Sequence, residues 1–367
     1  VAVEEINYRR FFDINDLAGV RIEDPEVLET THRLIFDWVD RGGISALRID
    51  HPDGLADPAG YFARLQETLF VRSCLQQFKA SADNDQRAEI EDHLRNRFRS
   101  AITEQPNSPL ARRFPIVVEK ILSRGEELPS SWAIDGTVGY EYLNSLNGLF
   151  VDSEGQGTIE AAYSKFTGDD KPWEEVVYEA KQLICRASLA SELNMLARQL
   201  NRVSEHDRRS RDFTLNDLRR ALREVIACFP VYRTYLQPDE PIAERDQVYI
   251  NQAVHRARRR NPTIDPSVFE FIRAALLLEH PEGISAEEIR QREAFVIRFQ
   301  QTTGPVTAKG VEDTAFYRQI KLASLNEVGG EPGRFGHSPS SFHALNSHRL
   351  NHWPGGFSTT ATHDNKR

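Results

Sequence analysis

The feature that most constrains the fold is a helix that leads directly into a short apolar strand. Asp24 is a natural N-cap, with Pro25 in the first helical position. Apolar residues recur at helical spacing from there to Trp38, and Gly42-Gly43 predicts the end of the helix. Residues 44–50, Ile-Ser-Ala-Leu-Arg-Ile-Asp, then predict a strand. A helix that precedes a mostly apolar strand is typical of a parallel sheet covered by helices, so we expect an α/β fold.

A second helix and a second strand are predicted in the first part of the chain. Residues 58–78 have helical periodicity after Pro58. Residues 79–110 are polar and charged, which predicts a helical excursion or a mobile loop without a clear core face. Residues 114–120, Phe-Pro-Ile-Val-Val-Glu-Lys, predict a buried strand that ends in charge. Helices and strands therefore alternate, as in a parallel sheet.

The middle of the chain is predicted to be mainly helical. Helical periodicity and helix start signals dominate residues 157–301, whereas a strand-like pattern returns at 304–309. Residues 326–358 are rich in Gly, Pro, Ser, His and Asn, which favours an ordered loop or lid. We expect a catalytic barrel portion over 1–156, a helical insertion over 157–301 and a return to the barrel over 302–367.

Charge, hydropathy and cysteine content limit the partners. The net charge of −9 argues against nucleic acid, whose phosphates would be repelled. No run approaches the roughly 18 apolar residues of a membrane helix, and no secretory signal is visible. Cys74, Cys185 and Cys228 fit neither a metal knuckle nor a disulfide framework, which is typical of reduced thiols. We expect a cytoplasmic protein with no nucleic-acid or membrane partner and no cofactor. The sequence shows no dedicated cluster of metal ligands and leaves calcium binding open.

One carboxylate follows the first predicted strand. Side chains at i and i+2 of a strand share a face, so Arg48 and Asp50 point the same way. At the C-terminal end of a barrel strand such a pair lies at the catalytic mouth, and the arginine keeps the carboxylate ionised. An ionised, oriented Asp50 suits a nucleophile. The alternative is an Arg48–Asp50 ion pair that only braces the fold.

Two more carboxylates follow strand-like runs. Glu119 ends the second predicted strand, where an apolar wall raises the pKa of a carboxyl and makes it a general acid. The alternative is a structural ion pair with Lys120 or a loop arginine. His363-Asp364 follows the strand-like run 357–362, and the alternative there is a structural hydrogen-bonded pair. A retaining glycosidase needs a nucleophile and an acid about 5–5.5 Å apart, so three strand-end carboxylates indicate glycoside chemistry.

Motifs along most of the chain resemble known sequences. The stretches similar to the second, third and fourth conserved regions of the alpha-amylase superfamily of glycoside hydrolases are residues 46–55, 117–122 and 359–364. The stretches that resemble the maltooligosyltrehalose synthase family within it are residues 6–15, 118–122, 135–141, 229–235 and 308–317. The resemblance implies a partial (β/α)8 TIM barrel with a large, mainly helical insertion. It also implies conversion of the reducing-end α-1,4 bond of a maltooligosaccharide into an α,α-1,1 bond.

The resemblance also implies roles for individual residues. Asp50 takes the nucleophile position, Glu119 the acid/base position and Asp364 the transition-state stabiliser position. The residues assigned to substrate binding and orientation are Arg48, His51, Asp53, Lys120, Lys309, Phe316, Tyr317, His363 and Lys366. For Phe316 and Tyr317 the alternative is core packing.

The implied substrate is a maltooligosaccharide or linear α-glucan, and the implied partner is a trehalose-releasing hydrolase. A hydrolase or other transglycosylase with the same carboxylates is the alternative among enzymes. A glucan-binding protein without catalysis is the alternative outside that class. The family's first conserved region and last barrel strand have no counterpart in the sequence, so the resemblance implies a fragment. We expect a chain of this extent to be inactive alone.

Overall fold

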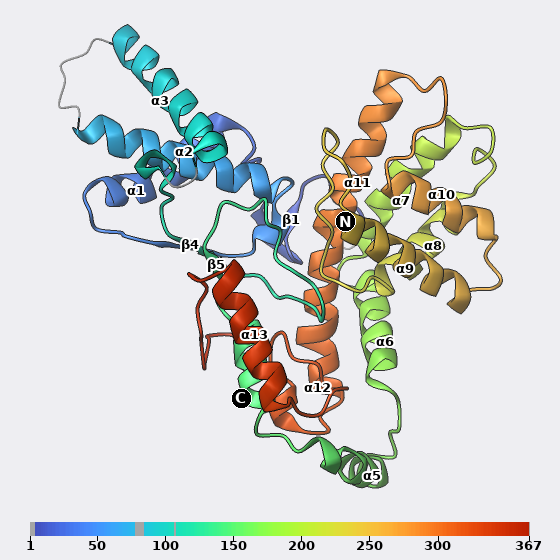
Figure 1. The fold of residues 1–367 in the computed structure, drawn as a ribbon. Helices are drawn as coiled ribbons and strands as arrows, with labels where there is room; N and C mark the ends of the chain where they lie inside the picture. Colours follow the sequence, from blue (N-terminus) through green and yellow to red (C-terminus); the bar gives the residue numbers. More distant parts are fainter. Residues whose placement is uncertain (1–3, 78–83, 106–107, 367) are drawn as a thin grey trace.

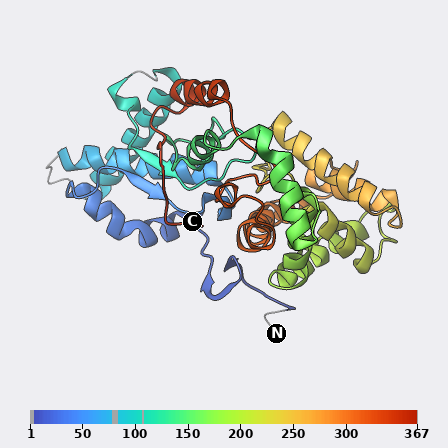
Figure 2. The same ribbon diagram turned by 90° about the horizontal axis from the view of Figure 1, so that it is seen from below.

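The structure is a computed structural model that describes residues 4–77, 84–105 and 108–366 (Figure 1). A small sheet with its helices lies on one side, and a group of helices lies on the other. The long helix α11 (Ala286–Thr307) lies between the two groups, and Figure 2 shows the same division from below.

The sheet is parallel and follows the order of the chain. Its strands are β3 (Leu47–Ile49), β4 (Ile116–Val118) and β5 (Gly136–Thr137), in the order β3-β4-β5. Leu47 pairs with Ile116, and Val117 pairs with Gly136. The α/β prediction is confirmed for this part, although these three strands do not close a barrel.

A separate antiparallel hairpin precedes the sheet. Its strands are β1 (Arg10–Phe11) and β2 (Ile14–Ala18). Arg10 fixes the hairpin to the helical group because its guanidinium Nε donates to Glu192 Oε1 at 2.8 Å. The N-terminal segment therefore contacts residues far along the chain.

The helices beside the sheet begin where local signals predict. Helix α1 (Pro25–Asp40) starts after Asp24, whose side chain accepts a hydrogen bond from the Glu26 amide at 2.9 Å. The predicted helix 58–78 is present as α2 (Pro58–Gln77), and Phe78 lies outside the described residues. Within 79–110, where residues 79–83 and 106–107 are likewise outside the described part, a helix is present as α3 (Asn84–Glu104).

Apolar side chains of α1 and α2 form one core with the strands. The fully buried members of this core are Phe36, Phe62, Leu65, Ile116 and Val118. Burial of each such side chain contributes about 1.5–3 kcal/mol, so the short strands are held mainly by the helices packed on them.

The middle of the described chain is helical, as predicted. The helices between the sheet and α11 are α4 (Tyr140–Gly148), α5 (Gln156–Thr167), α6 (Trp173–Arg186), α7 (Ala190–Glu205), α8 (Leu215–Ala227), α9 (Glu244–Arg260) and α10 (Pro266–Leu276). Helices α6 to α11 share a second core. No helix in the described ranges has the length and apolar character needed to cross a membrane.

Short helical turns complete the described elements. They are η1 (Pro52–Gly54), η2 (Pro109–Ala111), η3 (Ser153–Gly155), α12 (Phe316–Arg318) and η5 (Ala323–Leu325).

The strand predicted at 304–309 is wrong. Helix α11 continues through Thr307 and passes directly into a π-helix, η4 (Ala308–Ala315). Every side chain from Thr302 to Thr307 is buried, so packing outweighs the poor helix propensity of Gly304 and Pro305. The expected domain boundary at 301/302 therefore falls inside a helix.

Two further expectations near the C-terminus need correction. The segment 326–358 is not a loop throughout, because α13 (Pro339–His352) occupies much of it. Ser338 caps this helix, accepting from the Ser341 amide at 3.1 Å. Residues 357–362 form no strand, because the hydrogen bond from the Phe357 amide to the Thr137 carbonyl, 3.0 Å, is not continued into a ladder.

Candidate active site

Asp50 and Glu119 follow neighbouring strands at one edge of the sheet. Ile49 pairs with Val118 in register, and the Glu119 amide donates to the Ile49 carbonyl at 2.9 Å. The His51 amide donates to Glu119 Oε2 at 3.0 Å. The C-terminal edge of the sheet thus joins the two segments directly.

Asp50 is accessible and paired with an arginine. Arg48 Nη1 lies 2.7 Å from Asp50 Oδ1, and the Asp50 side chain is 59% exposed. An exposed ion pair contributes little to stability because water screens it. The Arg48–Asp50 ion pair is present, as both interpretations require. Because it is exposed, it favours an oriented, ionised Asp50 over an ion pair that only stabilises the fold.

Glu119 has the electrostatics of a proton donor. Burial, supported by the negative charges of Asp53 and Asp50, raises the pKa of Glu119 to about 7. The hydrogen bond from the His51 amide acts in the opposite direction. A carboxyl with its pKa near neutrality can both give and take a proton at the pH of a cell.

Asp364 approaches the same edge through Tyr140. The Tyr140 hydroxyl donates to Asp364 Oδ2, and Tyr140 begins α4 directly after β5. His363 Nε2 lies 3.5 Å from Asp364 Oδ1, and the Asp364 side chain is 38% exposed. Asp50 and Glu119 therefore follow β3 and β4 directly, and Asp364 is held near β5 by its hydrogen bond from Tyr140.

Asp53 and Lys120 lie in a buried ionic network under these strand ends. Lys120 Nζ is 3.4 Å from Asp53 Oδ2 and 3.0 Å from Glu126 Oε1, and its side chain is 0% exposed. The Tyr235 hydroxyl donates to Asp53 Oδ1 at 2.5 Å. Although burial acts to raise it, Lys120 and Arg233 hold the pKa of Asp53 below its ordinary value. In this structure neither Asp53 nor Lys120 opens to solvent.

The predicted binding residues near η4 differ in accessibility. Asp313 lies between two of them, 3.0 Å from Lys309 Nζ and 3.6 Å from Lys366 Nζ. Tyr317 is 57% exposed, and Lys366 Nζ lies 5.6 Å from its ring centroid. Phe316 is 1% exposed and stacks on the tryptophan that begins α6. For Phe316 the structure therefore agrees with core packing.

Comparison with known proteins identifies relatives of nearly the whole chain. No family model matches. A Mycobacterium tuberculosis protein named as a maltooligosyl trehalose synthase is 31% identical over 360 residues, which is 98% of this chain and 38% of that protein. The structure of maltooligosyltrehalose synthase from Arthrobacter ramosus is 34% identical with a TM-score of 0.75, covering 100% of this chain and 39% of that one.

The chain is homologous to the maltooligosyltrehalose synthases. A further synthase structure, from Sulfolobus tokodaii, is 26% identical with a TM-score of 0.65, over 98% of this chain and 37% of that one. The family resemblance indicated by the motifs is confirmed. The chain spans less than two fifths of the length of these synthases.

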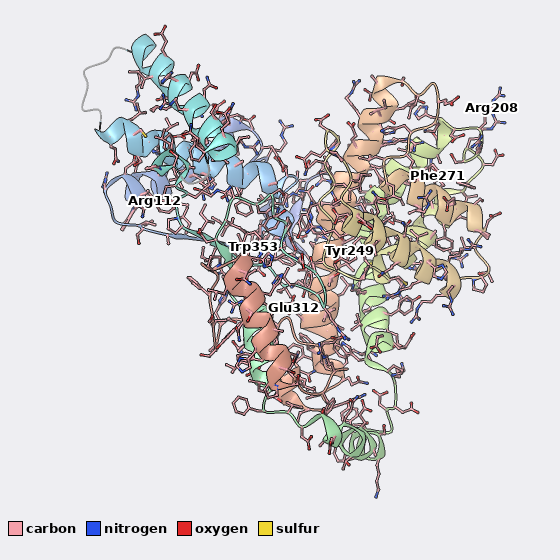
Figure 3. All side chains as sticks on the ribbon, viewed as in Figure 1. Arg112, Arg208, Tyr249, Phe271, Glu312 and Trp353 are labelled. Atoms are coloured by element: carbon pink, nitrogen blue, oxygen red, sulfur yellow. The ribbon has the colours of Figure 1, made fainter. Side chains whose placement is uncertain are left out.

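One acidic residue at the site was missed by the sequence analysis. Glu312 lies in η4, inside the synthase-like motif 308–317, and accepts a hydrogen bond from the Tyr232 hydroxyl at 2.6 Å. Burial raises the pKa of Glu312 to about 7. An acidic residue within that motif could have been chosen as a site candidate from the sequence. The wrong strand prediction at 304–309 gave no indication that the Glu312 side chain points toward Tyr232. Figure 3 labels Glu312 near the middle of the molecule, between α11 and α13.

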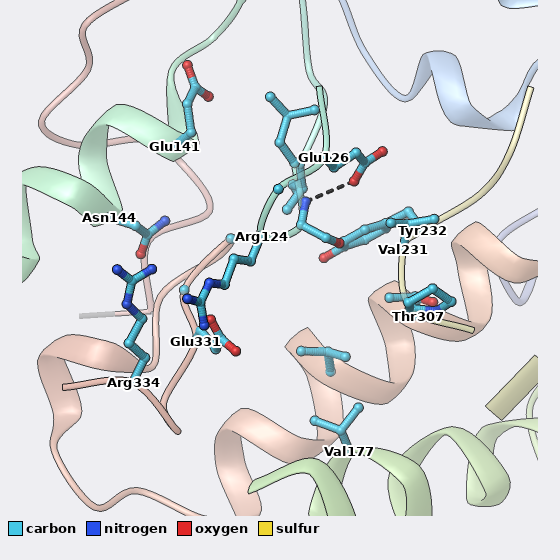
Figure 4. Close-up of a pocket in the computed structure, with 18 of the residues that line it drawn as sticks. Arg124, Glu126, Glu141, Asn144, Val177, Val231, Tyr232, Thr307, Glu331 and Arg334 are labelled. Atoms are coloured by element: carbon cyan, nitrogen blue, oxygen red, sulfur yellow. Dashed lines mark hydrogen bonds between the residues drawn. The ribbon is translucent and has the colours of Figure 1, made fainter. Parts of the chain in front are cut away.

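A cavity of about 1330 Å³ is lined in part by residues 121–128, the segment that follows Glu119. Arg124, Glu331 and Arg334 are on its wall, with Tyr232 and Glu126 at another part of it (Figure 4). Asp50, Glu119 and Asp364 do not line it. Among the described residues, no group of three or more His, Cys, Asp and Glu side chains is arranged to hold a metal ion.

Proposed function

We propose that this chain supplies the catalytic carboxylates of a maltooligosyltrehalose-forming enzyme. The reaction is intramolecular transglucosylation, which converts the reducing-end α-1,4 linkage of a maltooligosaccharide into an α,α-1,1 linkage. The observation that supports the proposal is that Asp50 and Glu119 directly follow the paired strands β3 and β4, and that Tyr140, just after β5, donates a hydrogen bond to Asp364. Its fold is then part of a (β/α)8 barrel, with catalytic groups at the C-terminal edge.

The proposed chemistry is a retaining double displacement. Asp50 attacks the anomeric carbon of the last α-1,4 linkage, while Glu119 protonates the departing glucose oxygen. The freed glucose turns and presents its anomeric hydroxyl, which Glu119, now a base, deprotonates for attack on the glucosyl ester. Asp364 stabilises the oxocarbenium-like transition states. Water must be kept out, because it would complete a hydrolysis.

The exposed residues around the carboxylates are proposed to hold the sugar. The predicted binding residues with accessible side chains are Arg48, Tyr317 and His363. Those proposed to contribute from partly or fully buried positions are His51, Asp53, Lys120, Lys309, Phe316 and Lys366. For Asp53 and Lys120 we propose an indirect contribution, which is to fix the segment between Asp50 and Glu119.

The cellular setting is proposed from the chemistry. A trehalose-releasing hydrolase would act on the product, since the new α,α-1,1 end is still joined to the glucan chain. Cys185 and Cys228 are free and buried, which agrees with a reducing, cytoplasmic location.

The test is a reducing-end assay with maltopentaose on a polypeptide that contains this chain together with the segments found in its longer relatives. Isomerisation removes reducing ends without shortening the glucan, whereas hydrolysis increases them. We expect reducing ends to fall, and a rise would identify a hydrolase instead. Asp50→Asn should lower the rate by at least about a thousandfold, whereas Asp212→Asn, at a side chain 92% exposed, should not change it.

A further inference from the structure

Glu312 belongs to an unusual helical segment next to the candidate site. It is part of the π-helix η4, and π-helical segments are rare and frequent at functional sites. At Gly310 the π-helix touches α6, because an added Cβ would lie 2.8 Å from Lys181 Cγ. Close packing on α6 therefore fixes η4 and the direction of the Glu312 side chain.

The surroundings of Glu312 are a mixture of a hydroxyl and charged groups. The Tyr232 hydroxyl donates to Glu312 Oε1 at 2.6 Å. After burial, the groups that act on the pKa of Glu312 are Tyr232 and Lys366, which lower it, and Asp313 and Asp364, which raise it. A partly buried carboxyl is thus held between one hydrogen-bond donor, one cation and two other acids.

Tyr232 connects Glu312 to the strand that carries Glu119. Its ring packs against the cluster formed by Val117 and Ile121, and its centroid lies 5.4 Å from Lys120 Nζ. Glu312 and Glu119 are both among the negative charges that raise the pKa of Tyr232, so its hydroxyl lies near both acids.

We propose that Glu312 is a positioning residue of the candidate active site, which holds Tyr232 by its hydroxyl and supplies a negative charge that keeps the proton on Glu119. The inference rests on the proposed role of Glu119 as the acid of the first step. It concerns a residue that does not itself touch the reacting atoms.

The physical reason is the coupling of two acids. The negative charge of Glu312 is among the causes that raise the pKa of Glu119. Removing that charge makes Glu119 release its proton at lower pH. The Tyr232 hydroxyl affects the same coupling, because its hydrogen bond lowers the pKa of Glu312 and so partly offsets burial, which raises that pKa to about 7.

The experiment is a carbon NMR titration of the 367-residue chain with glutamate labelled at the side-chain carboxyl. The Glu119 signal is assigned by its loss in Glu119→Gln. We expect the Glu119 midpoint to be lower in Glu312→Gln than in the parent, and lower in Tyr232→Phe as well. Glu312→Asp, which keeps the charge, should restore most of the shift. Glu331→Gln, which removes an acid on the cavity wall, should leave the midpoint unchanged.

The Glu119 titration midpoint in the variants decides whether Glu312 acts on Glu119. A Glu119 midpoint in Glu312→Gln equal to that of the parent overturns the inference, because a merely structural Glu312 would alter stability and not this titration. If Glu312→Gln does not fold, Tyr232→Phe alone gives the same decision. A parent Glu119 midpoint far below neutrality, still lowered by Glu312→Gln, would support the coupling while contradicting the proposed acid role of Glu119.

Discussion

At the residue scale, Glu119 should destabilise the folded chain as pH rises. Its pKa is about 7 in the folded state against an ordinary value of 4.5, because burial disfavours the ionised form. The folded state therefore binds the proton more tightly than the unfolded state does. The contribution is fully present below about pH 4.5 and is lost as pH rises through about 7.

Glu119→Gln should remove this dependence. Well above pH 7 we expect the variant to be more stable than the parent by about 3 kcal/mol, and below about pH 4.5 the difference should vanish. Urea unfolding at pH 5, 6.5 and 8 measures the trend. The matched change Glu240→Gln, at an exposed side chain, should give no such trend. A difference between Glu119→Gln and the parent that stays constant with pH would contradict the assignment.

Lys120 is expected to be the most sensitive cation near the site. Lys120→Met leaves Asp53 and Glu126 as buried carboxylates without their shared partner. Breaking a buried pair from one side costs about 3–5 kcal/mol. Lys171→Met removes an exposed ion pair of 2.6 Å with Glu179 and should cost less than about 1 kcal/mol. Comparable losses in the two variants, measured by urea unfolding, would count against this reading of the network.

At the scale of elements, segment 357–364 is held to the sheet by a glycine. Gly139 has φ +92°, and a Cβ there would lie 2.1 Å from the Phe357 carbonyl oxygen. Gly139→Ala should therefore push away the segment that carries Asp364. Gly168→Ala has the same kind of φ, +72°, but open space around it.

We expect Gly139→Ala to destabilise the chain by at least about 1 kcal/mol more than Gly168→Ala does. Protease digestion should also cut the region around residue 357 faster in Gly139→Ala alone. Equal unfolding midpoints for the two variants would show that backbone strain, and not the contact with Phe357, dominates at both positions.

Elements with local start signals were predictable, and those made by packing were not. Asp24 and the capping box at Ser285 specify where α1 and α11 begin, because the capping bonds lie within one turn of chain. The end of α11 depends on burial of Thr302–Thr307 among other helices, which no local pattern records. Helix α13 was hidden in a segment whose composition is that of a loop.

The candidate site was predictable to a similar extent. Asp50 and Glu119 directly follow short strands, so a strand pattern and the residue after it were sufficient to place them together. Asp364 is linked to the same edge through Tyr140, a contact across more than two hundred positions of chain. Glu312 depends on a π-helix packed against α6, which is a tertiary effect.

At the scale of the molecule, α11 joins the two halves. Phe295, Phe299 and Val306 of α11 belong to the core of the helical group, and its continuation, η4, carries Lys309 and Glu312. Gln301 on α11 also donates to the Gly54 carbonyl at 2.9 Å, beside the segment that follows Asp50. The helical group therefore contacts the segment that follows Asp50 directly.

The sheet has an open side in this chain. Among the described strands, β3 is paired only with β4, and α1 beside it exposes Leu34 by 68% and Trp38 by 53%. Large apolar side chains at such a position are typical of a surface that another element covers. Synthases of the family extend well beyond the matched part, which covers only 38% of the M. tuberculosis relative.

We therefore expect the 367-residue chain alone to form no trehalose end from maltopentaose. The side chains of Asp50 and Asp364 are 59% and 38% exposed, and transfer in place of hydrolysis requires that water be excluded. Borohydride-resistant, glucoamylase-resistant product is the measurement. A polypeptide extended by the remaining segments of its relatives should give that product, and Asp50→Asn in it should not. Trehalose-end formation by the 367-residue chain would show that the open sheet edge is no obstacle to catalysis.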